Sequence, residues 1–130
     1  TTMYNDYSIN EWLFHWQSQS TTADTSPTGQ RYINHRQRGS KVLLFVREFK
    51  TDMAGTAPYT FLGLADYIKH EGSRPMNITW KLHRPIPAKY LGRPKVGGGV
   101  KGEAFLFISS IAILKLFQNN IINQSAIHKS

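Results

Sequence analysis

Hydrophobic and polar residues alternate in short stretches along the chain, and this pattern predicts β-strands because successive side chains of a strand point to opposite faces. The stretch LFHWQSQ, residues 13–19, shows the alternation clearly. One predicted face carries Phe14, Trp16 and Ser18, and the other carries Leu13, His15 and Gln17. This strand combines large aromatic rings with amides and a histidine, which suits either a core strand or a recognition strand.

Four more stretches of strand character follow, separated by turns that are rich in Gly, Pro, Ser and Thr. They are RYINH (31–35), KVLLFVREFK (41–50), YTFLGLADYIKHEGS (59–73) and MNITWKLHRPIP (76–87). The second of them is a continuous apolar run, which predicts a central strand buried on both faces. Together the five stretches predict a mainly β fold, a small mixed or antiparallel β-barrel of about five strands.

The composition changes at the triple glycine, residues 97–99. Residues 3–95 are predicted to form the barrel-like module and residues 96–100 a glycine-rich hinge. Residues 101–130 form an apolar tail, which we expect to be helical and to be either diverged or non-native. The run Phe105–Phe117 has only 13 residues and contains Lys115. A membrane-spanning helix needs about 20 apolar residues, so no membrane partner is expected.

The distribution of charge suggests a polyanionic partner. The net charge is +8 at pH 7, and residues 31–95 contain 13 Lys and Arg against four acidic residues. A basic segment with interleaved aromatic residues is typical of nucleic-acid binding, and a solvated basic surface is the alternative. The candidate phosphate ligands are Arg31, Arg36, Arg38, Lys41, Arg47 and Arg74. For Arg47, an ion pair with Glu48 or Asp52 is about equally plausible.

Two stretches supply the chemistry needed to recognise a base, namely planar rings for stacking and amides or hydroxyls for hydrogen bonds to its edge. The candidate residues for this role are His15, Trp16, Gln17, Gln19, Gln30, Tyr32, Asn34 and His35. Burial in the core is the favoured alternative for Trp16, because large aromatic residues are usually buried. For the three glutamines, contact with a ligand is favoured over a structural role.

Several of these stretches together carry a resemblance to a known family. In chain order they are LFHWQSQ, SPTGQRYINH, KVLLFVRE, APYTFLG and HEGSRPMNITWKLHRPIPAKYL. From about Met3 to Arg93 the chain resembles the uncharacterised C-terminal domain of bacterial superfamily 2 DEAD/DEAH-box helicases. Some of those helicases also carry a phospholipase-D-like nuclease domain, and some restrict modified DNA. The segment after Gly97 does not resemble the ending of that family.

The resemblance implies a non-catalytic DNA-binding module that senses modified bases within a helicase or nuclease restriction system. In that family the preceding domains perform the catalysis, and this chain contains no G-x-x-x-x-G-K-[ST] phosphate loop, no helicase Asp-Glu box and no paired H-x-K motifs. The implied partners are DNA and the helicase and nuclease domains of a parent protein. We expect no cofactor.

The sequence also fits two other function classes, a metal-dependent nuclease and a protein-interaction adaptor. The tripeptide Glu48-Phe49-Lys50 resembles the E-x-K motif of metal-dependent nucleases, with Asp24 as a second carboxylate, although matches of three residues are common by chance. A protein-interaction adaptor of a helicase complex would use the same aromatic residues. The five histidines show no spacing for zinc and there is no cysteine, so no metal site is expected and a reducing, cytoplasmic location is consistent with the composition.

Overall fold

The computed structural model describes residues 6–49, 58–91, 106–117 and 120–128. Their strands form one sheet in the order β1-β2-β5-β4-β3-β6-β7, in which every neighbouring pair is antiparallel. The strands are β1 (Tyr7–Ser8), β2 (Leu13–Gln17), β3 (Ser40–Phe49), β4 (Thr60–Glu71), β5 (Asn77–Leu82), β6 (Leu106–Phe117) and β7 (Asn120–His128). A short helix α1 (Pro27–Ile33) and a 3-10 turn η1 (Ala88–Tyr90) complete the described elements.

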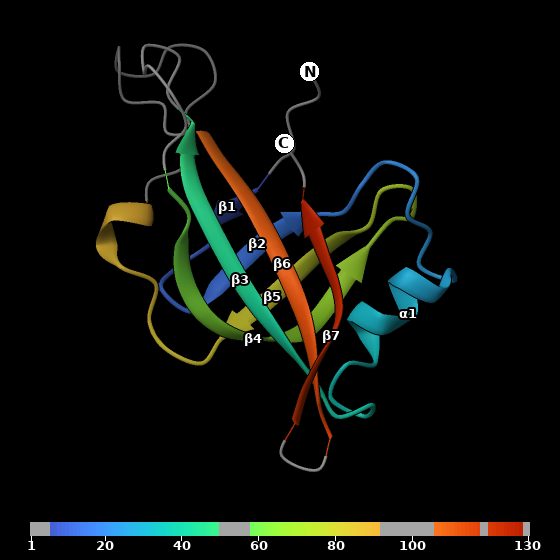
Figure 1. Ribbon diagram of the computed structural model, residues 1–130. Helices are drawn as coiled ribbons and strands as arrows, with labels where there is room; N and C mark the ends of the chain where they lie inside the picture. Colours follow the sequence, from blue (N-terminus) through green and yellow to red (C-terminus); the bar gives the residue numbers. More distant parts are fainter. Residues whose placement is uncertain (1–5, 50–57, 92–105, 118–119, 129–130) are drawn as a thin grey trace.

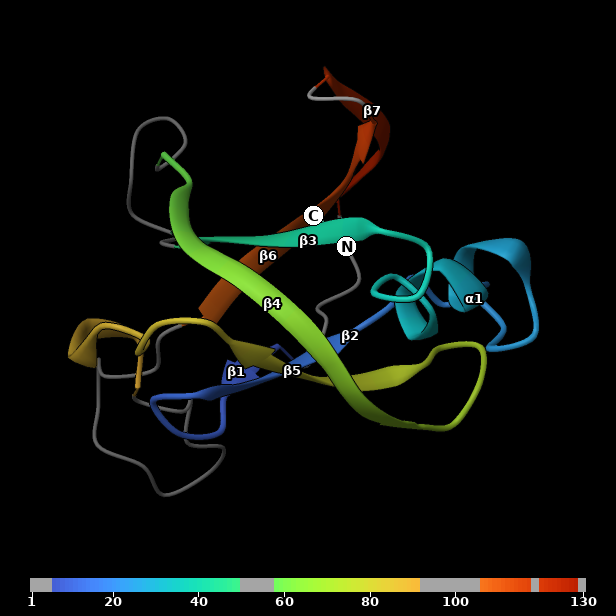
Figure 2. The ribbon, with the colours of Figure 1, turned by 90° about the horizontal axis from the view of Figure 1, so that it is seen from below.

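The sheet curls into a half-barrel (Figure 1). Figure 2 shows the long strand β4 crossing obliquely between the part of the sheet that contains β1, β2 and β5 and the part that contains β3 and β6. Helix α1 lies at one end of this curl, beside the ends of both parts. The predicted mainly β, barrel-like architecture is therefore confirmed in the form of a curled antiparallel sheet.

The core lies on the inner face of the curl, where β2, β3, β4, β5 and β6 all contribute buried side chains. Its largest members are Phe14, Trp16, Tyr32, Leu44, Leu62, Met76, Ile78, Trp80, Leu82, Ile111 and Ile113. The faces predicted for residues 13–18 are confirmed, because Phe14, Trp16 and Ser18 are buried and the residues between them are only half-buried. Residues 77–82 form a strand as predicted for that stretch, with Ile78, Trp80 and Leu82 in the core and Thr79 also buried.

Strand β3 occupies the central position predicted for it, between β4 and β6. The prediction that it is buried on both faces is wrong. Val42, Leu44 and Val46 are buried, whereas Leu43 and Phe45 on the other face are only partly covered. A continuous apolar run in this chain therefore supplies one core face and one accessible face.

The strand predicted for RYINH (31–35) is wrong, because these residues form the end of α1 and the turn that follows it. The local sequence explains the helix. Ser26 is the N-cap, and its side chain accepts a hydrogen bond from the backbone N–H of Gly29 at 3.0 Å. Pro27 occupies the first helical turn, where its missing N–H has no cost. The capping signal outweighs the weak alternation of RYINH.

The expectation of a helical tail is also wrong for the residues that the structure describes. Residues 106–117 and 120–128 form β6 and β7, which pair as a hairpin. Strand β6 also pairs with β3 over ten residues, from Ser40 opposite Lys115 to Phe49 opposite Leu106. The run FLFISSIAIL is rich in β-branched residues, which favour strands over helices. The proposed hinge, residues 96–100, lies outside the described residues.

The position of Ile111 predicts that the tail contributes to stability. Ile111 lies opposite Leu44 in the sheet and is 1% exposed within the core. Ile111→Ala should lower the free energy of unfolding by about 2–5 kcal/mol, because truncation of a buried side chain leaves a cavity. Urea unfolding would measure this. Ile68→Ala is the matched control, since Ile68 is 46% exposed and its truncation should change stability by less than about 0.5 kcal/mol. Equal stability of the two variants would show that β6 does not complete the core.

Candidate nucleic-acid interface

Three of the residues predicted to recognise a base lie in the core around Trp80. The ring of Trp80 contacts the rings of Trp16 at 6.4 Å, Tyr32 at 6.3 Å and His35 at 5.8 Å between centroids. Trp16, Tyr32 and His35 are each at most 1% exposed. The same burial raises the pKa of Tyr32 by disfavouring its charged form. In this structure these side chains pack inside the half-barrel, as anticipated for Trp16.

His35 fixes the turn after α1 to the sheet. Its Nε2 accepts a hydrogen bond from the backbone N–H of Tyr67 at 3.0 Å. Its Nδ1 therefore carries the proton and donates to the carbonyl oxygen of Ser40 at 3.2 Å. Burial lowers the pKa of His35, although the Ser40 carbonyl opposes that shift. The imidazole is thus held neutral in one tautomer, joining the start of β3 to β4.

The predicted amide donors are divided between structural contacts and the surface. Gln17 donates from Nε2 to Asn77 Oδ1 at 3.3 Å. Gln30 donates to the carbonyl oxygen of Asp24 at 2.8 Å and accepts from Asn34 Nδ2 at 2.8 Å. These contacts stabilise the β2–β5 pair and helix α1. Gln19 is exposed after β2.

His15 lies on the outer face of β2, where its ring stacks on that of Tyr7 at 4.6 Å with an interplanar angle of 10°. Trp12, in the turn before β2, is 40% exposed. The planar groups that remain accessible on β2 are therefore on the face opposite Trp16. The eight predicted base-recognition residues do not form one cluster.

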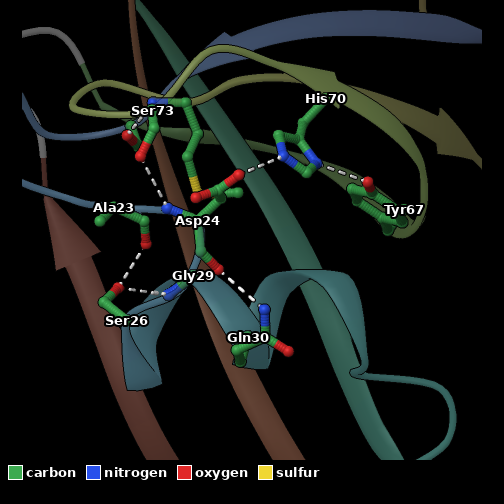
Figure 3. Close-up of polar contacts among 10 residues, drawn as sticks. Ala23, Asp24, Ser26, Gly29, Gln30, Tyr67, His70 and Ser73 are labelled. Atoms are coloured by element: carbon green, nitrogen blue, oxygen red, sulfur yellow. Dashed lines mark hydrogen bonds and ion pairs between the residues drawn. The ribbon is translucent and has the colours of Figure 1, made fainter.

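Asp24, His70 and Tyr67 form a chain of hydrogen bonds between the segment before α1 and strand β4 (Figure 3). His70 Nε2 lies 3.2 Å from Asp24 Oδ2, and His70 Nδ1 lies 2.7 Å from the Tyr67 hydroxyl. The hydrogen bond from His70 lowers the pKa of Asp24, and burial raises the pKa of Tyr67. Asp24 also donates its backbone N–H to Ser73 Oγ at 3.1 Å. This network ties the β4–β5 turn to the start of the helix.

Two of the predicted phosphate ligands, Arg36 and Lys41, lie together at a small pocket. Its volume is about 120 Å³, enough for a few waters or one phosphate group. The pocket lies where the turn after α1 meets the start of β3 and the middle of β4, and its lining comprises Arg36, Gly39, Ser40, Lys41, Val42, Leu64, Ala65, Asp66 and His83. Arg36 and Lys41 are exposed, and Arg36 donates to the carbonyl oxygen of Tyr67 at 3.3 Å.

The carboxylate in the pocket is hydrogen-bonded within the protein. Asp66 Oδ2 lies 2.9 Å from His83 Nε2. In the antiparallel β4–β5 register Asp66 lies opposite Lys81, and His83 donates its backbone N–H to the carbonyl oxygen of Leu64, so Asp66 and His83 are diagonal neighbours across the two strands. Gly39 has a φ of +70°, so the turn leading to Lys41 uses a conformation that glycine adopts without strain. The lining of the pocket thus contains two cations and a carboxylate that is hydrogen-bonded to His83.

The other predicted phosphate ligands are spread over the molecule. Arg31 lies in the last turn of α1, and Arg38 is exposed in the turn that follows. Arg74 is exposed in the β4–β5 turn, where its backbone N–H donates to the carbonyl oxygen of Thr22 at 2.9 Å. Arg47 lies with its guanidinium carbon 4.8 Å above the ring of Tyr59. Only Arg36 and Lys41 of this set line the pocket.

The residues of the nuclease hypothesis cannot be assembled into a site from the described part of the chain. Glu48 belongs to β3 by its backbone, and Lys50 and Asp52 lie outside the described residues. Asp24, in the segment before α1, is engaged with His70. Within residues 6–49, 58–91, 106–117 and 120–128, no group of three or more His, Asp or Glu is placed to hold a metal ion.

Sequence reasoning missed Asp66, His83, Phe61 and Arg84 as surface residues of interest. Asp66 and His83 are 17 positions apart and meet only through the β4–β5 register. Phe61 lies in the stretch predicted as the fourth strand, and its side chain is 41% exposed. The register shift between Leu44 and Phe45 reverses the face that the simple alternation of β4 assigns to Phe61. A bulge of this kind leaves no clear pattern in the sequence.

The described residues form a small, mainly β protein with a curled antiparallel sheet and a pocket whose lining includes Arg36 and Lys41. A family model described as "Domain of unknown function (DUF3427)" matches residues 1–92. The chain belongs to this family. No curated protein and no solved structure matches the chain. Among the described residues, no helix is long and apolar enough to cross a membrane.

The environment of His35 predicts that stability falls in weak acid. The pKa of His35 is lower in the folded protein than the ordinary histidine value of 6.5. At a pH below 6.5 the folded state therefore binds fewer protons than the unfolded state. Stability should therefore be fully present above about pH 6.5 and decline as the pH falls, by at most about 1.4 kcal/mol per pH unit for one proton. Urea unfolding between pH 8 and pH 5 would measure the slope.

An NMR titration of the imidazole resonances assigns this slope to a residue. His35 should remain neutral below pH 6.5, because burial lowers its pKa. If His35 titrates at or above 6.5, its burial does not govern the acid sensitivity.

Proposed function

We propose that the protein is a non-catalytic DNA-binding module. The observation that carries the proposal is the pocket whose lining includes both Arg36 and Lys41. Both cations are exposed, and the carboxylate in the lining, Asp66, is hydrogen-bonded to His83. A phosphate group in the pocket would gain two charge-assisted contacts. Contacts of this kind supply the sequence-independent part of DNA affinity.

The charge of the whole segment supports the same proposal. Residues 31–95 hold 13 Lys and Arg against four acidic residues. This excess would attract a polyanion over the range of a Debye length, about 8–10 Å at physiological salt. The pocket would then fix the position of one phosphate within a wider basic surface.

We further propose that the module is accessory to the helicase or nuclease domains of a bacterial restriction system and senses modified bases. Residues 3–93 resemble the C-terminal domain of bacterial superfamily 2 DEAD/DEAH-box helicases, and this resemblance supports the assignment. In such a system the cations would hold the DNA backbone while other residues inspect the bases. Exposed Gln19 and the Tyr7–His15 stack on the outer part of β2 provide polar and planar groups for that inspection.

Removal of the pocket cations should weaken DNA binding without regard to sequence. Arg36→Ala and Lys41→Ala should each reduce affinity for all duplexes alike and lower the slope of log affinity against log salt by about one. Fluorescence anisotropy across a salt series would measure both quantities. Lys89→Ala is the matched control, because it removes the same charge from η1, which lies away from α1 (Figure 1).

Three outcomes of this salt series are informative. Equal effects of Lys89→Ala and Arg36→Ala would show that only total charge matters and would remove the pocket from the proposal. Salt-independent affinity, or none at low salt, would contradict DNA binding altogether. If the wild-type protein binds modified and unmodified duplexes of one sequence equally, modified-base sensing fails and general DNA binding remains.

A further inference from the structure

We propose that the outer face of the β3–β4 hairpin binds single-stranded DNA, with one base stacked on Phe61 and Arg84. This inference rests on the proposed function and names the form of DNA that the same surface takes. It begins from the alternation in β3, where Val42, Leu44 and Val46 enter the core. The intervening residues Lys41, Leu43, Phe45 and Arg47 therefore project from the other face.

Phe61 is the most unusual residue of this face. It lies opposite Phe45 in the β3–β4 register, and the two rings are 5.2 Å apart with an interplanar angle of 40°. Phe45 is partly covered, whereas Phe61 is 41% exposed. An exposed phenylalanine near the start of β4 has hydrophobic surface available for a ligand.

Arg84 is held beside Phe61 by the backbone of β4. Its guanidinium carbon lies 5.4 Å from the centre of the Phe61 ring. Its Nε donates to the carbonyl oxygen of Leu62 and its Nη2 to that of Phe61, both at 3.2 Å. Two hydrogen bonds fix the guanidinium plane before any ligand arrives. Bases stack both on aromatic rings and on guanidinium planes, so the pair forms one prearranged platform.

Gly63 leaves the space that Arg84 occupies. A Cβ atom at this position would lie 3.0 Å from Arg84 Nε, and the backbone φ is +117°. Any other residue at position 63 would therefore be strained and would press on the arginine side chain. The β4 backbone thus accommodates Arg84 in its position over Phe61.

Cations lie on both sides of this platform along the hairpin. Arg47 stacks on Tyr59 at 4.8 Å on one side, and Lys41 reaches the phosphate pocket on the other. Lys41 and Phe45 are four residues apart in the strand, a distance of about 13 Å. An oligonucleotide of a few residues could place one phosphate in the pocket and a base on Phe61, which is the arrangement of stacking sites along a basic groove in single-strand-binding proteins.

The chemistry of the platform favours a single strand over a duplex or a protein. The flat faces of the bases are covered by their neighbours in a duplex and are accessible only where the strand is unpaired. A protein partner would match the apolar ring of Phe61 but would leave Arg47, Arg84 and Lys41 without a dense line of negative charge. The backbone of a single strand provides that line.

The decisive variant is Phe61→Leu, which keeps an apolar side chain and removes the ring. Its affinity for a short single-stranded DNA should fall by about 5- to 150-fold, since stacking on one aromatic residue contributes about that factor. Its affinity for the duplex of the same sequence and its melting temperature should stay unchanged. Phe61→Tyr should retain single-strand binding. Ile68→Ala, which truncates another exposed apolar residue of β4, should bind both forms like the wild-type protein.

The outcomes separate this inference from the function on which it rests. If the wild-type protein binds duplex DNA while Phe61→Leu and Ile68→Ala bind single strands equally well, stacking on Phe61 is contradicted and DNA binding stands. If no DNA of either form binds at low salt, both proposals fail. If a single-stranded RNA of the same sequence binds more tightly than the DNA and loses affinity in Phe61→Leu, the platform exists but its assignment to DNA is overturned.

Discussion

The packing of rings around Trp80 is the interaction on which the rest of the structure depends. Trp80 contacts Trp16 from β2, Tyr32 from α1, His35 from the following turn and Tyr67 from β4. These contacts fill the curl of the sheet and set the position of His35. His35 is hydrogen-bonded to Tyr67 and Ser40. Its neighbours Arg36 and Lys41 are therefore held at the same pocket beside β4. The aromatic core thereby positions the cationic pocket.

The two faces of the β3–β4 hairpin differ in character: the inner face is apolar, and the outer face carries cations and aromatic rings. Alternate residues of β3 fill the core, and a register shift beside Phe45 brings Phe61 to the outer face. The same strands that supply the hydrophobic core therefore present cations and rings on their other side. Phe61 thereby keeps 41% of its surface exposed, and this apolar surface is available to a ligand.

The sequence predicts the sheet well because alternation directly reflects burial. Phe14, Trp16, Ile78 and Trp80 take the faces that their spacing indicates. Helix α1 is missed because its signal lies in Ser26 and Pro27 and not in periodicity. The tail is mistaken for a helix because an apolar run without turns suits either structure, and only pairing with β3 decides between them.

The candidate site is less predictable than the fold. Arg36 and Lys41 can be proposed from charge alone, but their meeting with Asp66 and His83 depends on the β4–β5 register. Tyr32 and His35 have planar rings of the kind that stack on a base, yet both are buried in the core. Residue types therefore identify candidates for a binding site, but only tertiary packing determines which of their side chains are accessible.

The most direct test of this account is to map the DNA-binding surface by the backbone amide NMR shifts of the full chain during titration with a short single-stranded DNA. The account predicts saturable shifts concentrated at residues 36–45, 59–66 and 83–84, on the outer face of the hairpin and around the pocket. Shifts confined to α1 or to the turn before β2, or no shifts at low salt, would contradict it.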